Sequence, residues 1–278
     1  MDPVTTVISL ADADQEHLFG GKAVSLGAAI RAGLPVPPGA AIAAPLVDAI
    51  ASAPLSDVAA ILESTHVPDA RLAVRSSAVG EDSSGASFAG QHTTKLNVRR
   101  PQLLDAVRDV WASGRSDAAM AYRARKGLPL EPRIGVVVQL MVEPIAAGVL
   151  FTRNPLTGAD ERMIEAAWGL GEAIVNGSVT PDRFRLDTRG RIVEFTAGDK
   201  DVKVWWDADD GTMEIPLAAE LRTAPCLTTS QVEALHDLAE RCQRVWGPGL
   251  DIEWALGPDD RMYLLQCRPI TTLGALGS

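Results

Sequence analysis

Cysteine is scarce in this sequence, and its scarcity excludes a disulfide scaffold. The 278 residues include three cysteines, Cys226, Cys242 and Cys267. Three cysteines leave one unpaired in any disulfide scheme, and their spacing matches no metal-ligand motif. We therefore expect reduced thiols and a cytoplasmic protein.

We also expect neither a membrane anchor nor a secretory leader. The start, MDPVTTVISLADAD, is acidic and lacks the positively charged beginning of a signal peptide. The longest apolar runs, such as residues 134–138, are far shorter than the roughly 20 residues that cross a bilayer. We expect no membrane partner.

Negatively charged residues outnumber positively charged ones in this sequence. There are 26 Lys and Arg against 36 Asp and Glu, a formal net charge of −10. Nonspecific nucleic-acid binding requires a basic surface, so we expect no nucleic-acid partner. A few basic residues can still line one cleft for a polyanion. The length and the 46% content of hydrophobic residues suffice for one large or two modest domains.

The most informative stretch is residues 72–98, LAVRSSAVGEDSSGASFAGQHTTKLNV. An apolar run at 72–74 leads into a long polar insert, and alternation returns at 95–98. Ordered polar inserts of this length are more often functional than connecting. Arg75, Gly90 and Thr94 supply a guanidinium, a backbone amide that can approach a ligand closely, and a hydroxyl, which together suit an anion. A plain Ser- and Gly-rich surface loop is the alternative.

Two further polar positions are candidates for nucleotide contact. Lys22 follows two glycines and precedes a helical pattern from Ala23, which can place an amine near a phosphate, although this is not a Walker A loop. Gln139 interrupts residues 134–141, an apolar run typical of a strand buried on both faces. Its amide must pair with backbone groups or with an edge such as that of adenine. A solvated surface lysine and a backbone-paired glutamine are the alternatives.

Periodicity predicts the remaining elements in outline. We expect a helical pair within 44–63 broken at Pro54, one helix over 101–125, and an irregular segment over 199–224. A helix over 230–246 is predicted with Ser230 as N-cap and Glu233 in the capping-box position.

The last segment predicts a hairpin whose strands, 250–256 and 261–268, flank the turn GPDD. Alternation puts Asp251 and Glu253 on one face, and Gln266 and Arg268 on one face of the partner strand. Pairing across the turn brings Glu253 close to Gln266, directly or diagonally. Carboxylate and amide oxygens beside an arginine suit Mg²⁺ bound to a polyphosphate. A plain salt bridge between Glu253 and Arg268 is the alternative.

Taken in order, five blocks resemble the ATP-binding domain of the pyruvate, phosphate dikinase and phosphoenolpyruvate synthase family. They are GGKAVSLGAAIRAGLPVPPG, AVRSSAVGEDSSGASFAGQ, GVLFTRNPLTG, EAAWGLGEAIVNGSVTPDRF and DIEWAL with YLLQCRPIT. The nearest likeness is to the rifampicin phosphotransferase and phosphoenolpyruvate synthase branches. The resemblance implies an ATP-grasp-like α+β fold over residues 1–275. Its two lobes, about 1–130 and about 131–275, would hold the nucleotide between them.

The resemblance also implies roles for individual residues. Lys22 and Arg75 should contact phosphates, Gly90 and Thr94 should belong to the covering loop, and Gln139 should lie near the base. Glu253 and Gln266 should ligate Mg²⁺, and Arg268 should lie beside the transferring phosphates. Lys22, Arg75 and Arg268 are therefore the expected catalytic residues, with ATP and Mg²⁺ as cofactors. Glu165 and the turn WGLGE are additional candidates.

The implied activity is ATP-dependent transfer of a phosphoryl group to a histidine and then to a small-molecule acceptor. The four histidines, at positions 17, 66, 92 and 236, lack the setting of the family's shuttle residue. We therefore expect no phosphohistidine swivelling domain and no acceptor domain here, and a histidine supplied by a separate protein or domain. The alternatives are a stand-alone ATP-grasp kinase or ligase acting directly on a small molecule, and a non-catalytic ATP-binding regulatory subunit.

Overall fold

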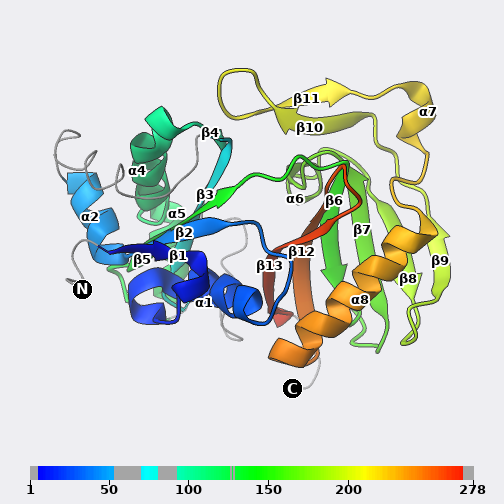
Figure 1. Ribbon diagram of the computed structural model, residues 1–278, viewed down its shortest axis with the longest axis horizontal. Coiled ribbons are helices and arrows are strands. Elements are labelled where there is room, and N and C mark those ends of the chain that lie inside the picture. Colours follow the sequence, from blue (N-terminus) through cyan, green and yellow to red (C-terminus); the bar gives the residue numbers. More distant parts are fainter. Residues whose placement is uncertain (1–5, 53–69, 81–92, 126, 128, 272–278) are drawn as a thin grey trace. The chain divides into compact units, whose positions relative to one another are not determined.

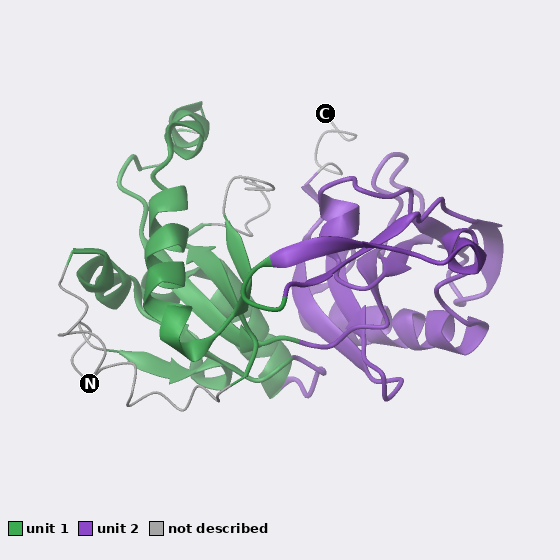
Figure 2. Ribbon diagram, turned by 90° about the horizontal axis from the view of Figure 1, so that it is seen from above, with its two compact units in different colours: residues 1–31, 37–141, 208–211 green, residues 32–36, 142–207, 212–278 purple. Residues whose placement is uncertain are grey.

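The computed structural model describes residues 6–52, 70–80, 93–125, 127 and 129–271. The chain divides into two compact units, which Figure 2 distinguishes by colour. Unit 1 comprises residues 1–31, 37–141 and 208–211, and unit 2 comprises 32–36, 142–207 and 212–278. Each unit contains an antiparallel sheet with packed helices, which confirms the expected α+β class.

The sheet of unit 1 has the strand order β1-β2-β5-β3-β4. Its strands are β1 (Val7–Ser9), β2 (Gly39–Ile42), β5 (Ile134–Leu140), β3 (Leu72–Ala78) and β4 (Thr94–Val98). The apolar strand β5 lies at the centre, as its composition predicts. Because β5 pairs with β2 and β3, the main division between the units falls at residues 141/142. The lobe boundary expected from the sequence, at about residue 130, lies on the N-terminal side of β5.

Strand β3 continues beyond the expected exit after residue 74. Ser76 and Ser77 are both buried, and they pair with Val136 and Gly135 of β5. Small hydroxyl side chains fit inside a sheet when their polar atoms are bonded, and Ser77 Oγ accepts a hydrogen bond from the amide of Ala23 at 2.9 Å. The polar composition of this segment therefore predicted a loop where the structure has a strand.

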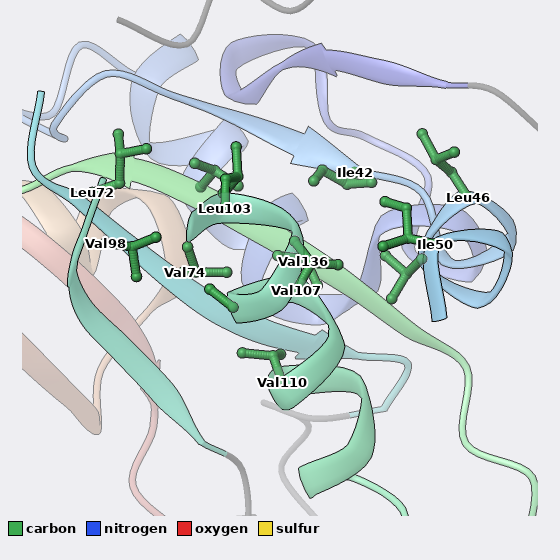
Figure 3. Packing of buried hydrophobic residues seen from close by; sticks show 13 residues of the cluster. Ile42, Leu46, Ile50, Leu72, Val74, Val98, Leu103, Val107, Val110 and Val136 are labelled. Atoms are coloured by element: carbon green, nitrogen blue, oxygen red, sulfur yellow. The ribbon is translucent and has the colours of Figure 1, made fainter. Parts of the chain in front are cut away.

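Helices pack on both faces of the unit 1 sheet. They are α1 (Glu16–Arg31), α2 (Ala44–Ser52) and α4 (Leu103–Ser113). Helix α5 (Asp117–Arg125) follows α4, and 3₁₀ turns lie at Leu10–Asp12 and Arg100–Gln102. Figure 3 shows α2 and α4 contributing Ile50 and Val107 to one apolar cluster with Val74 and Val136 of the sheet. The neighbouring residue Gly135 lies against the backbone of Phe19 in α1, so α1 covers the opposite face.

The single helix expected over residues 101–125 is wrong. The structure has two helices, because Gly114 ends α4 and Ser116 begins the next helix by accepting a hydrogen bond from the amide of Ala119 at 3.3 Å. The first half of the pair predicted within 44–63 is confirmed as α2, and the remainder, with Pro54, lies outside the described residues.

The sheet of unit 2 has the strand order β13-β12-β6-β7-β8-β9. Its strands are β6 (Ala146–Phe151), β7 (Arg162–Trp168), β8 (Asp182–Leu186), β9 (Ile192–Thr196), β12 (Leu250–Leu256) and β13 (Met262–Pro269). The long helix α8 (Thr229–Trp246) crosses one face of this sheet (Figure 1). The predicted terminal hairpin is confirmed as β12 and β13.

Two local predictions in unit 2 are corrected. The segment expected to be irregular contains the paired strands β10 (Val202–Trp206) and β11 (Thr212–Pro216), and the short helix α7 (Ala219–Arg222). The helix α6 (Glu172–Val175) follows the WGLGE turn. Helix α8 starts earlier than predicted, because Thr228 has an extended backbone and forms the capping box with Gln231. Among the described residues, none of the helices has the length and apolar character of a membrane span.

Candidate functional site

Three of the predicted residues lie on one face of the unit 1 sheet. Arg75 pairs with Thr94 on one side and with Val137 on the other, and Gln139 is two residues from Val137. Residues that pair directly across antiparallel strands project from the same face, as do residues two apart on one strand. Arg75, Thr94 and Gln139 therefore share the face on which α1 packs.

Lys22 is held against this sheet by the geometry of Gly20. Gly20 has φ 79°, and a Cβ atom at that position would lie 1.8 Å from the carbonyl oxygen of Ser77. Only glycine allows α1 to approach β3 this closely. Lys22 is consequently buried, with 6% of its surface exposed, and its Nζ donates to the carbonyl of Ser76 at 2.9 Å. The alternative of a solvated surface lysine is wrong.

The structure describes the other predicted residues of unit 1 to different extents. Gln139 is buried, and its Nε2 donates to the carbonyl of Pro37 at 3.2 Å, as the backbone-pairing alternative expects. The side chain of Arg75 is half-buried and that of Thr94 is exposed at the start of β4. Gly90 and most of the predicted covering loop lie outside the described residues.

The unit 2 residues gather on the opposite side of their sheet from α8. Glu253 of β12 pairs directly with Gln266 of β13, which confirms that the two residues lie close together. A register shift between Glu253 and Trp254 sets them opposite each other. Glu253 also pairs with Val149 of β6, which in turn pairs with Glu165 of β7. Glu165 is bonded to Arg183 of β8 at 2.9 Å. A row of polar residues thus runs across this face of the sheet.

Asp251 is the functional candidate to which sequence reasoning assigned no role. It pairs with Arg268 in the strand register, and its Oδ2 accepts hydrogen bonds from Nε at 2.9 Å and Nη2 at 2.8 Å of that guanidinium. Arg268 therefore forms an ion pair with Asp251, a pairing that sequence reasoning did not consider beside the alternative of a salt bridge with Glu253. Burial raises the pKa of Asp251, and the guanidinium of Arg268 opposes this shift. The sequence did contain a signal for Asp251, because it lies two residues before Glu253 and therefore on the same face of the strand.

The unit 2 set fits a magnesium ion that shares its ligands with phosphate. Glu253 offers a carboxylate, and the buried Gln266 offers an amide oxygen directly opposite. Mg²⁺ takes oxygen ligands and commonly binds through one or two carboxylates together with substrate phosphates. Within the described ranges, no group of three or more His, Cys, Asp or Glu side chains is arranged to hold a metal ion by itself. The guanidinium of Arg268 has the planar geometry that binds phosphate oxygens.

Comparison with known proteins identifies a nucleotide-binding family. The family described as pyruvate phosphate dikinase, AMP/ATP-binding domain, matches residues 48–276. A probable phosphoenolpyruvate synthase of Methanothermobacter thermautotrophicus is 38% identical over 94% of this chain and 45% of its own length. The prodigiosin synthesizing transferase PigC of Serratia marcescens is 39% identical over 98% of this chain and 34% of its own length. A rifampicin phosphotransferase of Streptomyces sviceus is 43% identical over 72% of this chain and 23% of its own length.

The chain spans less than half the length of these relatives. Among solved structures, an L-amino acid ligase from Bacillus licheniformis is 13% identical with a TM-score of 0.43, covering 90% of this chain and 42% of that one. A similarity at that level carries no argument about function. The match to the family covers most of the chain and includes the hairpin that bears Glu253, Gln266 and Arg268. The chain belongs to the family of the pyruvate phosphate dikinase AMP/ATP-binding domain, and it is an ATP-binding member of that family.

Proposed function

We propose that this chain is the nucleotide-binding catalytic unit of a cytoplasmic, dikinase-type phosphotransferase. It would bind ATP with Mg²⁺ and donate a phosphoryl group to a histidine outside these 278 residues, from which the group passes to a small-molecule acceptor. The observation that carries the proposal is the register of β12 and β13, which sets Glu253 opposite Gln266 and Asp251 opposite Arg268 on one sheet face. Oxygen ligands for a cation and a guanidinium for phosphate are thereby held side by side.

In unit 1, the proposed role of Lys22 and Arg75 is to neutralise phosphate charge. Lys22 is buried, and a buried charge interacts more strongly with a nearby anion than one in bulk water does. The contact between Lys22 Nζ and the Ser76 carbonyl holds the amine next to Arg75 on β3. Thr94 would add a hydroxyl donor, Gly90 a backbone amide, and Gln139 an amide for the edge of the base.

In unit 2, Glu253 and Gln266 would hold the Mg²⁺ ion. When bound, the ion supplies positive charge that offsets the negative charge of the phosphates. Asp251 contacts Nε and Nη2 of Arg268, which fixes the plane of the guanidinium that would bind the transferring phosphate. Catalysis of this kind depends on positioning and charge neutralisation by residues already in place.

The acceptor is proposed to be selected elsewhere. The names of the relatives refer to phosphoenolpyruvate, prodigiosin and rifampicin, which are chemically unlike one another. These relatives are similar to this chain over 72–98% of its length, which supports a choice of acceptor by segments outside it. A separate phosphohistidine-carrying protein or domain would deliver the phosphoryl group to the acceptor.

The test is calorimetric titration with ATP in the presence and absence of Mg²⁺, on wild type and Glu253→Gln. We expect Mg²⁺ to tighten ATP binding to wild type and to have a much smaller effect on Glu253→Gln. Glu233→Gln, which changes an exposed residue of α8, is the matched control and should behave as wild type. ATP binding that is insensitive to Mg²⁺ and to Glu253 would contradict the proposal.

A product assay separates the dikinase reaction from direct kinase activity. With a histidine-bearing phosphoacceptor protein of the family present, transfer in the dikinase mode yields AMP and phosphate. Steady release of ADP with an added small molecule would instead indicate the stand-alone kinase. Glu253→Gln should suppress AMP formation without changing the circular dichroism spectrum.

A further inference from the structure

A cavity of about 380 Å³ opens in unit 2 where the C-terminal half of α8 meets one end of the sheet. It is lined by side chains from the loop after β6, the start of β7, the turn after β8, α8, and the short segment that follows α8. The lining residues are Arg153, Asp160, Arg162, Thr188, Glu240, Gln243, Arg244 and Pro248.

This cavity is distinct from the residues proposed to bind ATP. Arg162 bonds to Glu240 and Gln243 of α8, so its side chain projects from the sheet face that α8 crosses (Figure 1). Glu165, three positions further along the same strand, projects from the other face, where Glu253 and Gln266 lie. The two groups of residues are therefore separated by the thickness of the sheet.

The charges lining the cavity do not cancel. Arg162 is only 4% exposed, and its Nη2 donates to the Glu240 carboxylate and, at 2.9 Å, to Gln243 Oε1. This pair neutralises Glu240, while the Nε of Arg162 is enclosed without a hydrogen-bond partner in the described part of the chain. Arg153 and Arg244 then face a single remaining carboxylate of the lining, that of Asp160. On a chain of net charge −10, this is a local excess of positive charge.

The guanidinium groups of Arg153 and Arg244 make few polar contacts with the described part of the chain. Within the described ranges, Arg153 makes one polar side-chain contact, from Nη1 to the carbonyl of Gly158 at 3.5 Å, the outer limit of a hydrogen bond. For Arg244, the described structure records no side-chain hydrogen bond or ion pair, and the residue is exposed. Both groups can turn toward a ligand without breaking a strong internal contact.

The neutral groups of the lining add further donors. Gln243 uses its Oε1 to accept from Arg162, which leaves the amide Nε2 as the donor end of this side chain. Thr188 contributes a hydroxyl. Donors therefore outnumber acceptors, and the matching ligand is an anion whose oxygens only accept. Arginine forks match the oxygens of a phosphoryl group in geometry as well as in charge.

We propose that this arginine cavity is a second anion site, which binds the phosphoryl group of a small phosphorylated molecule independently of the ATP-binding residues. The volume lies within the range of small-molecule sites, and it exceeds what a single phosphate ion fills. The polar lining suits a hydrophilic ligand. This site goes beyond the proposed phosphotransferase function and does not depend on it.

The test is calorimetric titration with inorganic pyrophosphate in metal-free buffer at about 0.1 M ionic strength, where charges further away than about 10 Å are largely screened. Arg153→Gln/Arg244→Gln should weaken binding to the cavity by about a hundredfold, since each lost charge-assisted contact is worth about tenfold. Arg189→Gln removes the same charge from the turn that carries Thr188, outside the lining, and should bind within twofold of wild type.

A further variant separates the two sites. Lys22→Met/Arg268→Met removes two residues of the proposed ATP site and should leave pyrophosphate binding at the cavity intact. Pyrophosphate affinity unchanged in Arg153→Gln/Arg244→Gln, or lost only in Lys22→Met/Arg268→Met, would overturn the proposal, as would the absence of binding to wild type. Arg244→Gln alone changes an exposed residue and should fold normally, so its expected tenfold loss tests the site even if the double variant is unstable.

Discussion

Replacing Lys22 with methionine should separate nucleotide binding from stability. The side chain is buried, with 6% of its surface exposed, and its Nζ donates to the Ser76 carbonyl at 2.9 Å. Methionine fills nearly the same volume, so the packing of α1 against β3 is kept. The variant loses a charged hydrogen bond but no longer has to bury an ammonium group. These two effects oppose each other, and the free energy of unfolding should change by no more than about 1 kcal/mol.

ATP binding should respond much more strongly than stability. A charge-assisted hydrogen bond contributes about 1.5–3 kcal/mol, which corresponds to a loss of roughly 10- to 100-fold in affinity. The measurements are calorimetric titration with ATP·Mg²⁺ and urea unfolding of the same samples. Lys95→Met is the matched control, because Lys95 is 41% exposed and paired with Asp109 at 2.7 Å on the surface. ATP affinity within twofold of wild type in Lys22→Met would refute the assigned role, and so would a loss of affinity matched by an equal loss of stability.

Three further predictions concern the packing that supports the two units. Gly20→Ala should destabilise the protein by more than about 2 kcal/mol and weaken ATP binding. The reason is that Gly20 has φ 79° and that a Cβ atom there would lie 1.8 Å from a carbonyl oxygen of β3. Urea unfolding measures the first effect and calorimetry the second. Lys200→Met should cost about 3–5 kcal/mol in urea unfolding, because it leaves the carboxylate of Asp182 without its cation at a site where both residues are 0% exposed. Burial, and then the charge of Asp182, raise the pKa of the Cys226 thiol far above its ordinary value of 9.0. The pKa of this thiol is higher in the folded state than in the unfolded state, so the stability that it contributes below about pH 9 is lost at more alkaline pH. Urea unfolding of wild type and Cys226→Ala at about pH 8 and at about pH 10 measures this loss.

Each of these has a variant that isolates its cause. Gly33 also has a positive φ, 73°, but a Cβ atom there would meet nothing within 4 Å in the described part of the chain, so Gly33→Ala should cost only about 1–2 kcal/mol. Equal effects at Gly20 and Gly33 would contradict the close approach of α1 to β3. Asp182→Asn combined with Lys200→Met removes both charges and should recover part of the stability lost in Lys200→Met alone. If the free energy of unfolding falls as steeply across this alkaline range in Cys226→Ala as in wild type, ionisation of the Cys226 thiol is not the cause of the fall.

The buried pair of Asp182 and Lys200 shows why some of the packing escaped prediction. Asp182 accepts hydrogen bonds from the amide of Gly198 at 2.7 Å, from Lys200 and from the amide of Cys226 at 2.8 Å. These partners come from separate segments. Cys226 lies shortly after residues 199–224, whose composition predicted irregular structure. Charged residues are usually solvated, so neither Asp182 nor Lys200 stands out until the fold brings them together.

The sequence by itself determined the family resemblance, the apolar strand β5 and the terminal hairpin. These depend on local patterns, since alternation specifies which side chains share a face and the turn residues mark where the hairpin reverses, which places Glu253 near Gln266. Their direct pairing also depends on the register shift between Glu253 and Trp254, which the pattern did not predict. For the same reason, the oxygen-rich set of unit 2 was predictable in advance.

Only the tertiary structure decided the burial of Lys22, the partnership of Arg268 with Asp251 and the existence of the arginine cavity. Each depends on contacts between segments far apart in the sequence. Lys22 is enclosed because Gly20 lets α1 lie against β3, and the cavity forms because α8 crosses the end of a sheet assembled from distant strands. Long-range packing of this kind leaves no periodic signal in the chain, because its free energy comes from surfaces that meet only after folding.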